Sequence, residues 1–363
     1  MTEKLTAWLC LKTAPGLKLA ETLRLLSKFP NPVEFVGKPG HPLYKEEGLS
    51  EAVKRHLARA VPPANLEQIR NLCQHYQIDL LCYTDGDYPL ALRHIYAPPL
   101  IIYHRGDLVP ALNKVCLGVV GTRKPSAYGR EMCKKLLGPV CQRGITVISG
   151  LAMGIDTLAH ETALANKAPT LAVLASGVEQ IYPPANRELA QKIIHQGALL
   201  SEYEPGTKLE QWNFPARNRI ISALSQAVFI VEGPMSSGAL LTAKHAIEQN
   251  REVMALPGNI NHPNAQGPNY LIKTGAQCIT CPEDILTSLG LEAELKEQIE
   301  FLPVLSADEQ KLFDLIKTEQ RELVFDELLL LSGHNIGKLS TLLLNLELKG
   351  YICKAGGNSF ILA

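Results

Sequence analysis

A glycine turn beside two cations is the first feature of this sequence that could do chemistry. The segment VCLGVVGTRKPSAYGRE, residues 115 to 131, reads as a buried strand that runs into Gly121 and then into a helix. Glycine lets a backbone approach a phosphate closely, and the free amides at the start of a helix attract anions. Because Arg123 and Lys124 stand in this loop, the segment predicts a site for an anion.

Further cations follow along the chain. Residues 121 to 144 hold six basic residues and one acid, a local surplus of five positive charges. The segment FPARNRIIS carries Arg217, Asn218 and Arg219, and we interpret it as a loop. A basic run is more often a solvated face, but arginines placed in loops rather than along an exposed helix favour a binding site.

Hydroxyl and amide groups complete the set. The segment GPMSSGALLTA places Ser237 and Gly238 at the start of a helix, whose first amides have no partner within the helix. If all these loops share one edge of a sheet, their amides, hydroxyls and guanidinium groups line an extended anionic groove. One phosphate does not need so long a lining, whereas a strand of several phosphates does.

Two common nucleotide motifs are excluded. A dinucleotide site needs G-x-G-x-x-G and an acidic residue about 20 residues further on. Arg123 breaks the glycine pattern, and the next strand ends at Ser149-Gly150 without a carboxylate. The sequence contains no G-x-x-x-x-G-K-[ST] segment, so a P-loop ATPase is excluded as well.

Hydrolytic and metal chemistry are weaker alternatives. Asp156 and His160 are four residues apart on one expected helix, with Ser149 near in sequence. We favour a structural interpretation, in which Asp156 caps the helix and His160 packs, because no oriented nucleophile and base can be derived from these positions. Cys278 and Cys281 form a lone C-x-x-C, and structural zinc needs four ligands, so we expect no metal and no cofactor.

Apolar runs alternate with helical patterns through the centre of the chain, which predicts an α/β fold with an extended Rossmann-like parallel sheet. The loops that leave these strands hold the polar and glycine-rich segments, at the edge where such sheets bind ligands. Strands are expected at residues 115–120, 145–148, 170–174, 198–200, 227–231 and 252–256, and helices at 128–143, 156–167 and 238–250.

Two flanking regions differ from this pattern. The first, residues 1–65, is expected to be a helical domain of SAM or helix-hairpin-helix type, with Pro15-Gly16 between two helices. Such a turn can offer amides to a DNA phosphate, but on so short a match an ordinary turn is the better interpretation. Residues 66–290 form the expected sheet domain. After a charged connector, residues 300–363 predict three helices and a hairpin around Gly356-Gly357, which is a winged helix.

The overall composition is typical of a globular protein, and its balanced charge produces no strong overall electrostatic field. The chain has 363 residues, 46 % of them hydrophobic, and a formal net charge of zero. Its nine cysteines are scattered and odd in number, which is typical of reduced thiols. No segment reads as a signal peptide or a membrane span, so we expect a cytoplasmic protein that does not contact a membrane.

Six segments, in this order, resemble the DNA processing protein A family (DprA, also called Smf). They are GTRKPSAYG, ISGLAMGIDTLAH, LASGVEQIYPPAN, FPARNRIISALS, VFIVEGPMSSGALLTAKHA and ALPGNI with QGPNYLIKTGA, and they span about residues 80 to 285. One departure stands at Ala185, where many relatives carry a basic residue after YPP. A contact made there in relatives is either missing here or supplied from elsewhere.

The resemblance implies a non-enzymatic, dimeric protein that binds single-stranded DNA. It also implies that the protein protects incoming DNA and loads the RecA recombinase during natural transformation. The residues that it implies for DNA contact are Gly121, Arg123, Ser126, Ser149, Gly150, Gly154, Arg217, Asn218, Arg219, Ser237 and Gly238.

Two questions remain open at this stage. From Leu291 onward the chain has twelve acids and seven bases, a net charge of −5, so our hypothesis is that the winged helix contacts protein rather than duplex DNA. The rival function is a nucleotide-processing hydrolase similar to the lysine-decarboxylase-like phosphoribohydrolases. Those enzymes use a catalytic glutamate after a glycine loop, and the comparable segment SSGALLTA offers Thr242 instead.

Overall fold

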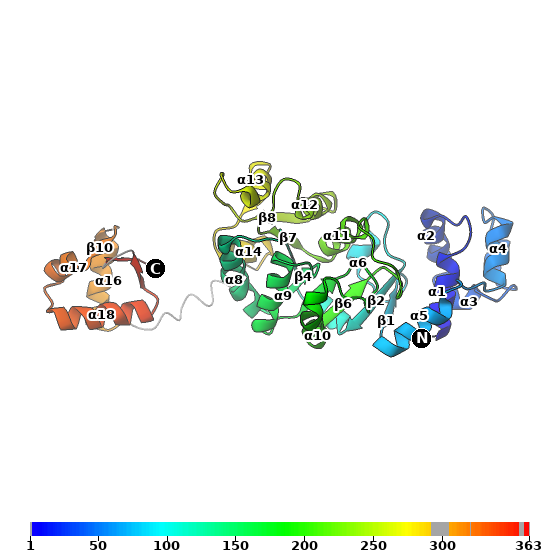
Figure 1. Cartoon of the computed structure of the whole chain (residues 1–363), viewed down its shortest axis with the longest axis horizontal. Helices are drawn as coiled ribbons and strands as arrows, with labels where there is room; N and C mark the ends of the chain where they lie inside the picture. Colours follow the sequence, from blue (N-terminus) through cyan, green and yellow to red (C-terminus); the bar gives the residue numbers. More distant parts are fainter. Residues whose placement is uncertain (1, 292–304, 320, 356–358, 363) are drawn as a thin grey trace. The chain divides into compact units, whose positions relative to one another are not determined.

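The structure is a computed structural model that describes residues 2–291, 305–319, 321–355 and 359–362. The chain forms two compact units, residues 1–290 and residues 291–363, and each is described by itself (Figure 1). The charged connector lies outside the described residues, as does the expected turn at Gly356-Gly357. In the described part of the chain, no helix is long and apolar enough to cross a membrane.

A mixed sheet forms the centre of the first unit. Its strand order is β1-β2-β6-β5-β4-β3-β7-β8-β9. All neighbours from β6 to β9 pair in parallel, whereas β2 is antiparallel to both β1 and β6. The strands are β1 (Asp79–Cys82), β2 (Ile101–Gly106), β3 (Cys116–Val120), β4 (Thr146–Ser149), β5 (Thr170–Val173), β6 (Gly197–Ser201), β7 (Ala227–Ile230), β8 (Glu252–Ala255) and β9 (Gln277–Cys278).

The expected α/β class and the parallel sheet are confirmed. Every residue of β3, β4, β5, β6 and β7 is buried, because helices cover both faces of the sheet. From β3 the chain builds the sheet in one direction through β6, then returns to the other side of β3 with β7. The order therefore reverses between β3 and β7, and the crevice at such a reversal is where doubly wound sheets bind ligands.

Helices cover the two faces of the sheet in separate groups, with α8 to α10 on one side and α11 to α13 on the other (Figure 1). Serine side chains cap the N-termini of two of these helices. The Ser126 hydroxyl accepts from Gly129 N of α8, and the Ser237 hydroxyl accepts from Ala239 N of α12. The helices of this part are α6 (Leu90–Arg93), α7 (Leu108–Leu112), α8 (Ala127–Gln142), α9 (Ile155–Ala165), η2 (Pro184–Asn186), α10 (Arg187–Gln196), α11 (Asn213–Leu224), α12 (Gly238–Glu248), η3 (Pro263–Ala265), α13 (Gln266–Lys273) and α14 (Pro282–Ser288).

The segment FPARNRIIS is helical, so its interpretation as a loop is wrong. It lies in α11, which crosses from β6 to β7 and carries Arg217, Asn218 and Arg219. Pro215 lies in the first turn of this helix. A proline in the first turn of a helix removes only an amide that has no partner within the helix, so Pro215 does not prevent helix formation there.

The N-terminal residues form α1 (Thr2–Lys12), α2 (Leu19–Lys28), α3 (Pro32–Phe35), η1 (Pro42–Lys45), α4 (Glu51–Ala58) and α5 (Leu66–Tyr76). Pro15 and Gly16 lie in the turn between α1 and α2, where Gly16 has φ +79°. Side chains of these helices, such as Trp8 and Leu26, share one hydrophobic core with Leu199 of the sheet. A separate domain over residues 1–65 stays a prediction, as does the interpretation of Pro15-Gly16 as an ordinary turn without a DNA contact.

The C-terminal unit is a winged helix with its own core. It contains α16 (Ala307–Glu319), β10 (Leu323–Val324), α17 (Phe325–Ser332), α18 (Ile336–Leu348), β11 (Ile352–Ala355) and β12 (Ser359–Leu362). The three strands form one antiparallel sheet in the order β10-β12-β11. At the start of α16, Ser306 and Glu309 exchange hydrogen bonds between side chain and backbone, which is the capping box that the sequence predicts.

Candidate nucleic-acid interface

The loop after β3 is wedged between two other elements at the sheet edge. Thr122 N donates to Glu232 O at 2.7 Å, and Ile155 N of α9 donates to Thr122 O at 3.2 Å. A Cβ atom on Gly121 would lie 2.6 Å from the Ile155 side chain, so only glycine fits there. This loop is therefore held at the crevice between β3 and β7.

Glu232 is a functional residue that sequence reasoning missed. Its side chain follows β7 and is buried at 4 % exposure. Its carboxylate accepts from Ser126 N at 2.8 Å and from the Ser126 hydroxyl. The half-buried Ser126 side chain thus ties the first loop to the segment after β7.

The loop after β4 supplies close backbone contacts rather than hydroxyl groups. Ser149 is fully buried, and its hydroxyl donates to Val119 O at 2.6 Å. Gly154 has φ +86°, and a Cβ atom there would lie 2.7 Å from the carbonyl carbon of Arg123. Asn186 holds the next loop to this one, because its side-chain amide donates to Leu151 O at 2.9 Å.

Arg217 is the internal brace of the site. It is 4 % exposed, and its Nη1 donates to Gly150 O at 2.8 Å and to Val173 O. A Cβ atom on Gly150 would lie 2.6 Å from the Arg217 Cζ, so the glycine makes room for the guanidinium group. Burial lowers the pKa of Arg217 to about 10, partly offset by the charge of Asp156. Burial likewise raises the pKa of Asp156, and Arg217 opposes that shift.

Arg123 is the predicted residue whose charged side chain reaches the surface. It is exposed, and its guanidinium carbon lies 5.4 Å from the ring centroid of Phe214 on α11. The Phe214 ring is 5.8 Å from the exposed ring of Tyr182. Trp212, two residues before Phe214, is 70 % exposed. The Arg123 guanidinium therefore lies over the Phe214 ring beside the glycine loops, with the Tyr182 ring next to Phe214, and sequence reasoning missed both rings.

The start of α12 closes the other side of the site. Gly238 is exposed, with no atom within 4 Å of the position that a Cβ would take. Asn218 of α11 donates its side-chain amide to Gly238 O at 3.2 Å, and its side-chain oxygen accepts from Arg217 Nε at 3.3 Å. Asn218 thus connects Arg217 to the N-terminus of α12, where Ser237 is the N-cap residue.

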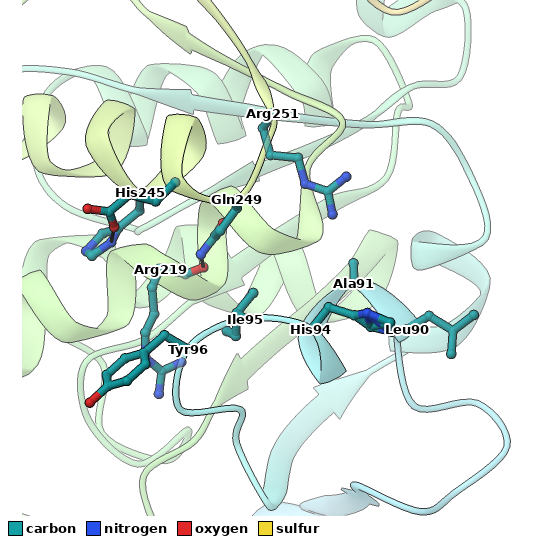
Figure 2. A pocket seen from close by; sticks show the side chains of 10 residues that line it. Leu90, Ala91, His94, Ile95, Tyr96, Arg219, His245, Gln249 and Arg251 are labelled. Atoms are coloured by element: carbon teal, nitrogen blue, oxygen red, sulfur yellow. Dashed lines mark hydrogen bonds and ion pairs between the residues drawn. The ribbon is translucent and has the colours of Figure 1, made fainter.

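The structure brings the loops after β3, β4 and β7 together, and Arg219 is the exception. Its guanidinium group pairs with Glu202 and lines a different hollow, which none of the other predicted residues lines (Figure 2). The reason is helical geometry, because two residues along a helix point about 200° apart. Among the eleven predicted residues, Ser149 and Arg217 are buried supports, and Arg123 and Gly238 face solvent.

The hydrolytic constellation does not form a reactive site. His160 is fully buried, and its Nδ1 lies 2.7 Å from the Thr170 hydroxyl. Burial, with a smaller contribution from Arg217, lowers the pKa of His160 to about 3, so the ring is neutral near pH 7. Thr242, the residue in place of a catalytic glutamate, is also fully buried. His160 packs as the structural interpretation expects, but the expected cap at Asp156 is wrong, because Gly154 is the N-cap of α9 and the Asp156 carboxylate accepts from Ala152 N at 3.3 Å instead.

A model of the family described as DNA recombination-mediator protein A matches residues 79–290, which is more than half of the chain. The chain belongs to this family. A second model, the DprA winged helix domain, matches residues 300–358. The expected DprA/Smf resemblance is therefore confirmed, and membership places the chain among the DNA recombination mediators.

Individual DprA and Smf proteins agree with this assignment. The chain is 39 % identical over 238 residues to DNA processing protein DprA of Bacillus subtilis, a match that covers 66 % of this chain and 80 % of that protein. It is 38 % identical over 290 residues to protein Smf of Escherichia coli, covering 78 % and 74 %.

Solved DprA structures share the fold. The X-ray structure of DprA from Streptococcus pneumoniae aligns with TM-score 0.66 at 31 % identity, over 79 % of this chain and 97 % of that one. DprA from Helicobacter pylori aligns with TM-score 0.54 at 29 % identity, over 61 % and 98 %, and its structure describes how that protein binds single-stranded DNA.

The winged helix of this DprA family member has little free positive charge on α18. Lys338 pairs with Asp308 and Lys349 pairs with Glu309, both at 2.6 Å. The Lys349 bond lowers the pKa of Glu309 to about 2. The outward side of α18 instead carries exposed aliphatic side chains, namely Ile336, Leu344 and Leu348.

Proposed function

We propose that the chain binds single-stranded DNA across the crevice between β3 and β7, without catalysing a reaction. The observation that carries this proposal is the exposed Arg123 guanidinium over Phe214, beside two loops that Gly121 and Gly154 allow to pack closely together. A cation neutralises a phosphate, and exposed rings offer a surface on which unpaired bases stack. Duplex DNA has no free base faces, so this combination favours a single strand.

The residues of the proposed interface divide into three roles. Arg123 and Gly238 form the contact surface, together with the rings of Tyr182 and Phe214. Gly121, Gly150 and Gly154 allow close packing within the protein. The remaining residues act as positioning residues, because their side chains are engaged in hydrogen bonds within the protein: Ser126, Ser149, Arg217, Asn218 and Ser237.

The wider role follows from the family. We propose that the protein acts as a cytoplasmic homodimer that protects incoming single strands and loads RecA onto them during natural transformation. The family match to a DNA recombination mediator supports this role. The rival hydrolase lacks an accessible carboxylate at Thr242, and release of free base from nucleoside monophosphates by the purified protein would revive it.

Replacing Arg123 with alanine tests the interface. We expect the affinity for a fluorescent oligothymidylate of about 16 nucleotides to fall about tenfold, since one cation and its stacking contact are lost. The slope of log K against log salt should fall by about 0.7 for the phosphate no longer neutralised. The measurement is fluorescence anisotropy, combined with thermal unfolding to show that the variant is folded.

Arg130→Ala is the matched control, because Arg130 is an exposed arginine of the same basic stretch on α8. An unchanged dissociation constant for Arg123→Ala would contradict the interface. An electrophoretic shift with single-stranded and duplex oligonucleotides, with and without RecA, tests the wider role. RecA should assemble on the single strand with the wild-type protein and not with Arg123→Ala.

The winged helix is proposed to contact protein. Deleting residues 291–363 should leave the affinity for single-stranded DNA within about twofold and the salt slope unchanged, because α18 presents no unpaired lysine of its own. The same anisotropy titration measures this. Duplex binding by the isolated segment 300–363 with a steep salt slope would show that this hypothesis is wrong.

A further inference from the structure

A second hollow lies away from the proposed interface, on the side of α11 that carries Arg219. It has a volume of about 610 Å³ and lies between the segment that contains α6 and the C-terminal ends of α11 and α12 (Figure 2). This volume is typical of small-molecule sites. The side chains that decide its chemistry are those of His94, Tyr96, Arg219, His245, Glu248 and Arg251.

Two arginines of this hollow have donors without an acceptor. Arg219 pairs with Glu202 through Nη2, but its Nη1 is shielded from solvent and has no hydrogen-bond partner among the described residues. Arg251 donates through Nη2 to Ala223 O at 3.1 Å, while its shielded Nε likewise has no partner in the described part of the chain. These two nitrogens are shielded from the hollow, but the positive charges of the two arginines that line it favour an anionic ligand.

Tyr96 stands at the mouth of the hollow, and packing does not explain its position. Its side chain is 94 % exposed, and it lines the same hollow as Arg219 (Figure 2). The next residue, Ala97, has φ +52°, which is unusual for a residue other than glycine. A hydrogen bond fixes the segment after this turn, because the buried Tyr88 hydroxyl donates to Pro99 O at 2.6 Å. The protein thus presents an aromatic ring to solvent on a fixed turn.

Two other polar side chains of the hollow, those of His245 and Glu248, can form hydrogen bonds with the polar groups of a sugar or a base. His245 Nδ1 lies 3.4 Å from Glu248 Oε2 on the same side of α12, and the Glu248 carboxylate is exposed. A carboxylate at this place accepts hydrogen bonds from hydroxyl or amino groups and disfavours a ligand that is only an anion. The ligand class must therefore combine a planar aromatic part, a polar edge and an anionic group.

We infer that this hollow binds a nucleotide, with its base on Tyr96 and its phosphate between Arg219 and Arg251. Glu248 accepts from the sugar or from an amino group of the base. The nucleotide comes either from solution or from a single strand that continues over α11 from the proposed interface. The inference does not depend on DNA binding at Arg123, because a free nucleotide can occupy the hollow on its own.

Calorimetric titration of the full chain with dAMP, and separately with inorganic phosphate, tests this inference. We expect dAMP to bind, and Tyr96→Ala to weaken that binding about tenfold through the lost stacking contact. Arg251→Gln should weaken it by a similar factor, with the thermal midpoint recorded because the bond to Ala223 is also lost. Tyr270→Ala is the matched control, since Tyr270 is an exposed tyrosine of α13 that does not line the hollow.

The two sources are separated by repeating the titrations with an oligothymidylate. If Tyr96→Ala weakens only dAMP binding, the hollow takes a free nucleotide. If it also weakens oligonucleotide binding, the hollow takes one unit of the strand. The inference is overturned if Tyr96→Ala and Arg251→Gln bind both ligands like the wild type, or if phosphate binds as tightly as dAMP. Arg123→Ala should leave dAMP binding unchanged, which keeps failure at the interface distinct from failure at the hollow.

Discussion

Replacing Arg217 with methionine is expected to lower the free energy of unfolding by about 3–5 kcal/mol, because it removes a buried charge that interacts with Asp156 and leaves two buried carbonyl oxygens without their donor. The change leaves Asp156 buried without the positive charge that opposes its desolvation. It also removes the donor to Gly150 O and Val173 O. Methionine fills much of the same volume, so the loss reports the charge and the hydrogen bonds rather than a cavity. Urea unfolding at neutral pH measures it.

Arg123→Met is the matched control for this prediction. Arg123 is exposed, so its replacement should change the free energy of unfolding by no more than about 0.5 kcal/mol. Combining Arg217→Met with Asp156→Asn should recover part of the stability, because the unpaired buried charge is then gone. If Arg217→Met alone lowers the free energy of unfolding by less than about 1 kcal/mol, the contacts of Arg217 do not contribute substantially to stability.

Replacing Gly154 with alanine is expected to affect both stability and DNA binding. The residue has φ +86° and ψ −124°, a conformation that is largely restricted to glycine and costs an alanine about 1–3 kcal/mol. The new Cβ would also lie 2.7 Å from the carbonyl carbon of Arg123, so the first loop must move. We therefore expect a total loss of more than about 2 kcal/mol, since overpacking adds to the backbone strain. Oligonucleotide binding should weaken as well, because the displaced loop carries Arg123.

Gly144→Ala separates the effect of backbone strain from the effect of steric overlap with the first loop. Gly144 has φ +73° but no atom within 4 Å of the position of a new Cβ, so only the backbone strain applies. This variant should lose about 1–2 kcal/mol and keep its affinity for DNA. Thermal unfolding and fluorescence anisotropy on both variants give the comparison. Equal losses, with equal affinities, would contradict the close fit between the second loop and the first.

Several features of the fold could be predicted because they depend on local sequence. The runs CLGVV and AVFI are apolar at every position, and a parallel sheet covered on both faces requires such strands. The helix starts at Ser126 and Ser237 follow from serine side chains that satisfy free amides. Phe214 was missed because FPARNRIIS looks like a loop, although Pro215 in a first turn is a signal that permits a helix.

The sequence by itself determined the α/β class, the parallel strands of the central sheet, the winged helix, and the polar loops after β3, β4 and β7, but not the helix that carries Arg217. Tertiary structure alone decided the role of each polar side chain. Arg217 and Arg219 have the same side chain and stand two residues apart, yet one is a buried brace and the other lines a separate hollow. The physical reason is that local propensities depend on neighbours in the chain, whereas burial and orientation depend on which elements pack together. That packing is set by contacts between residues far apart in sequence, such as Arg217 with Gly150.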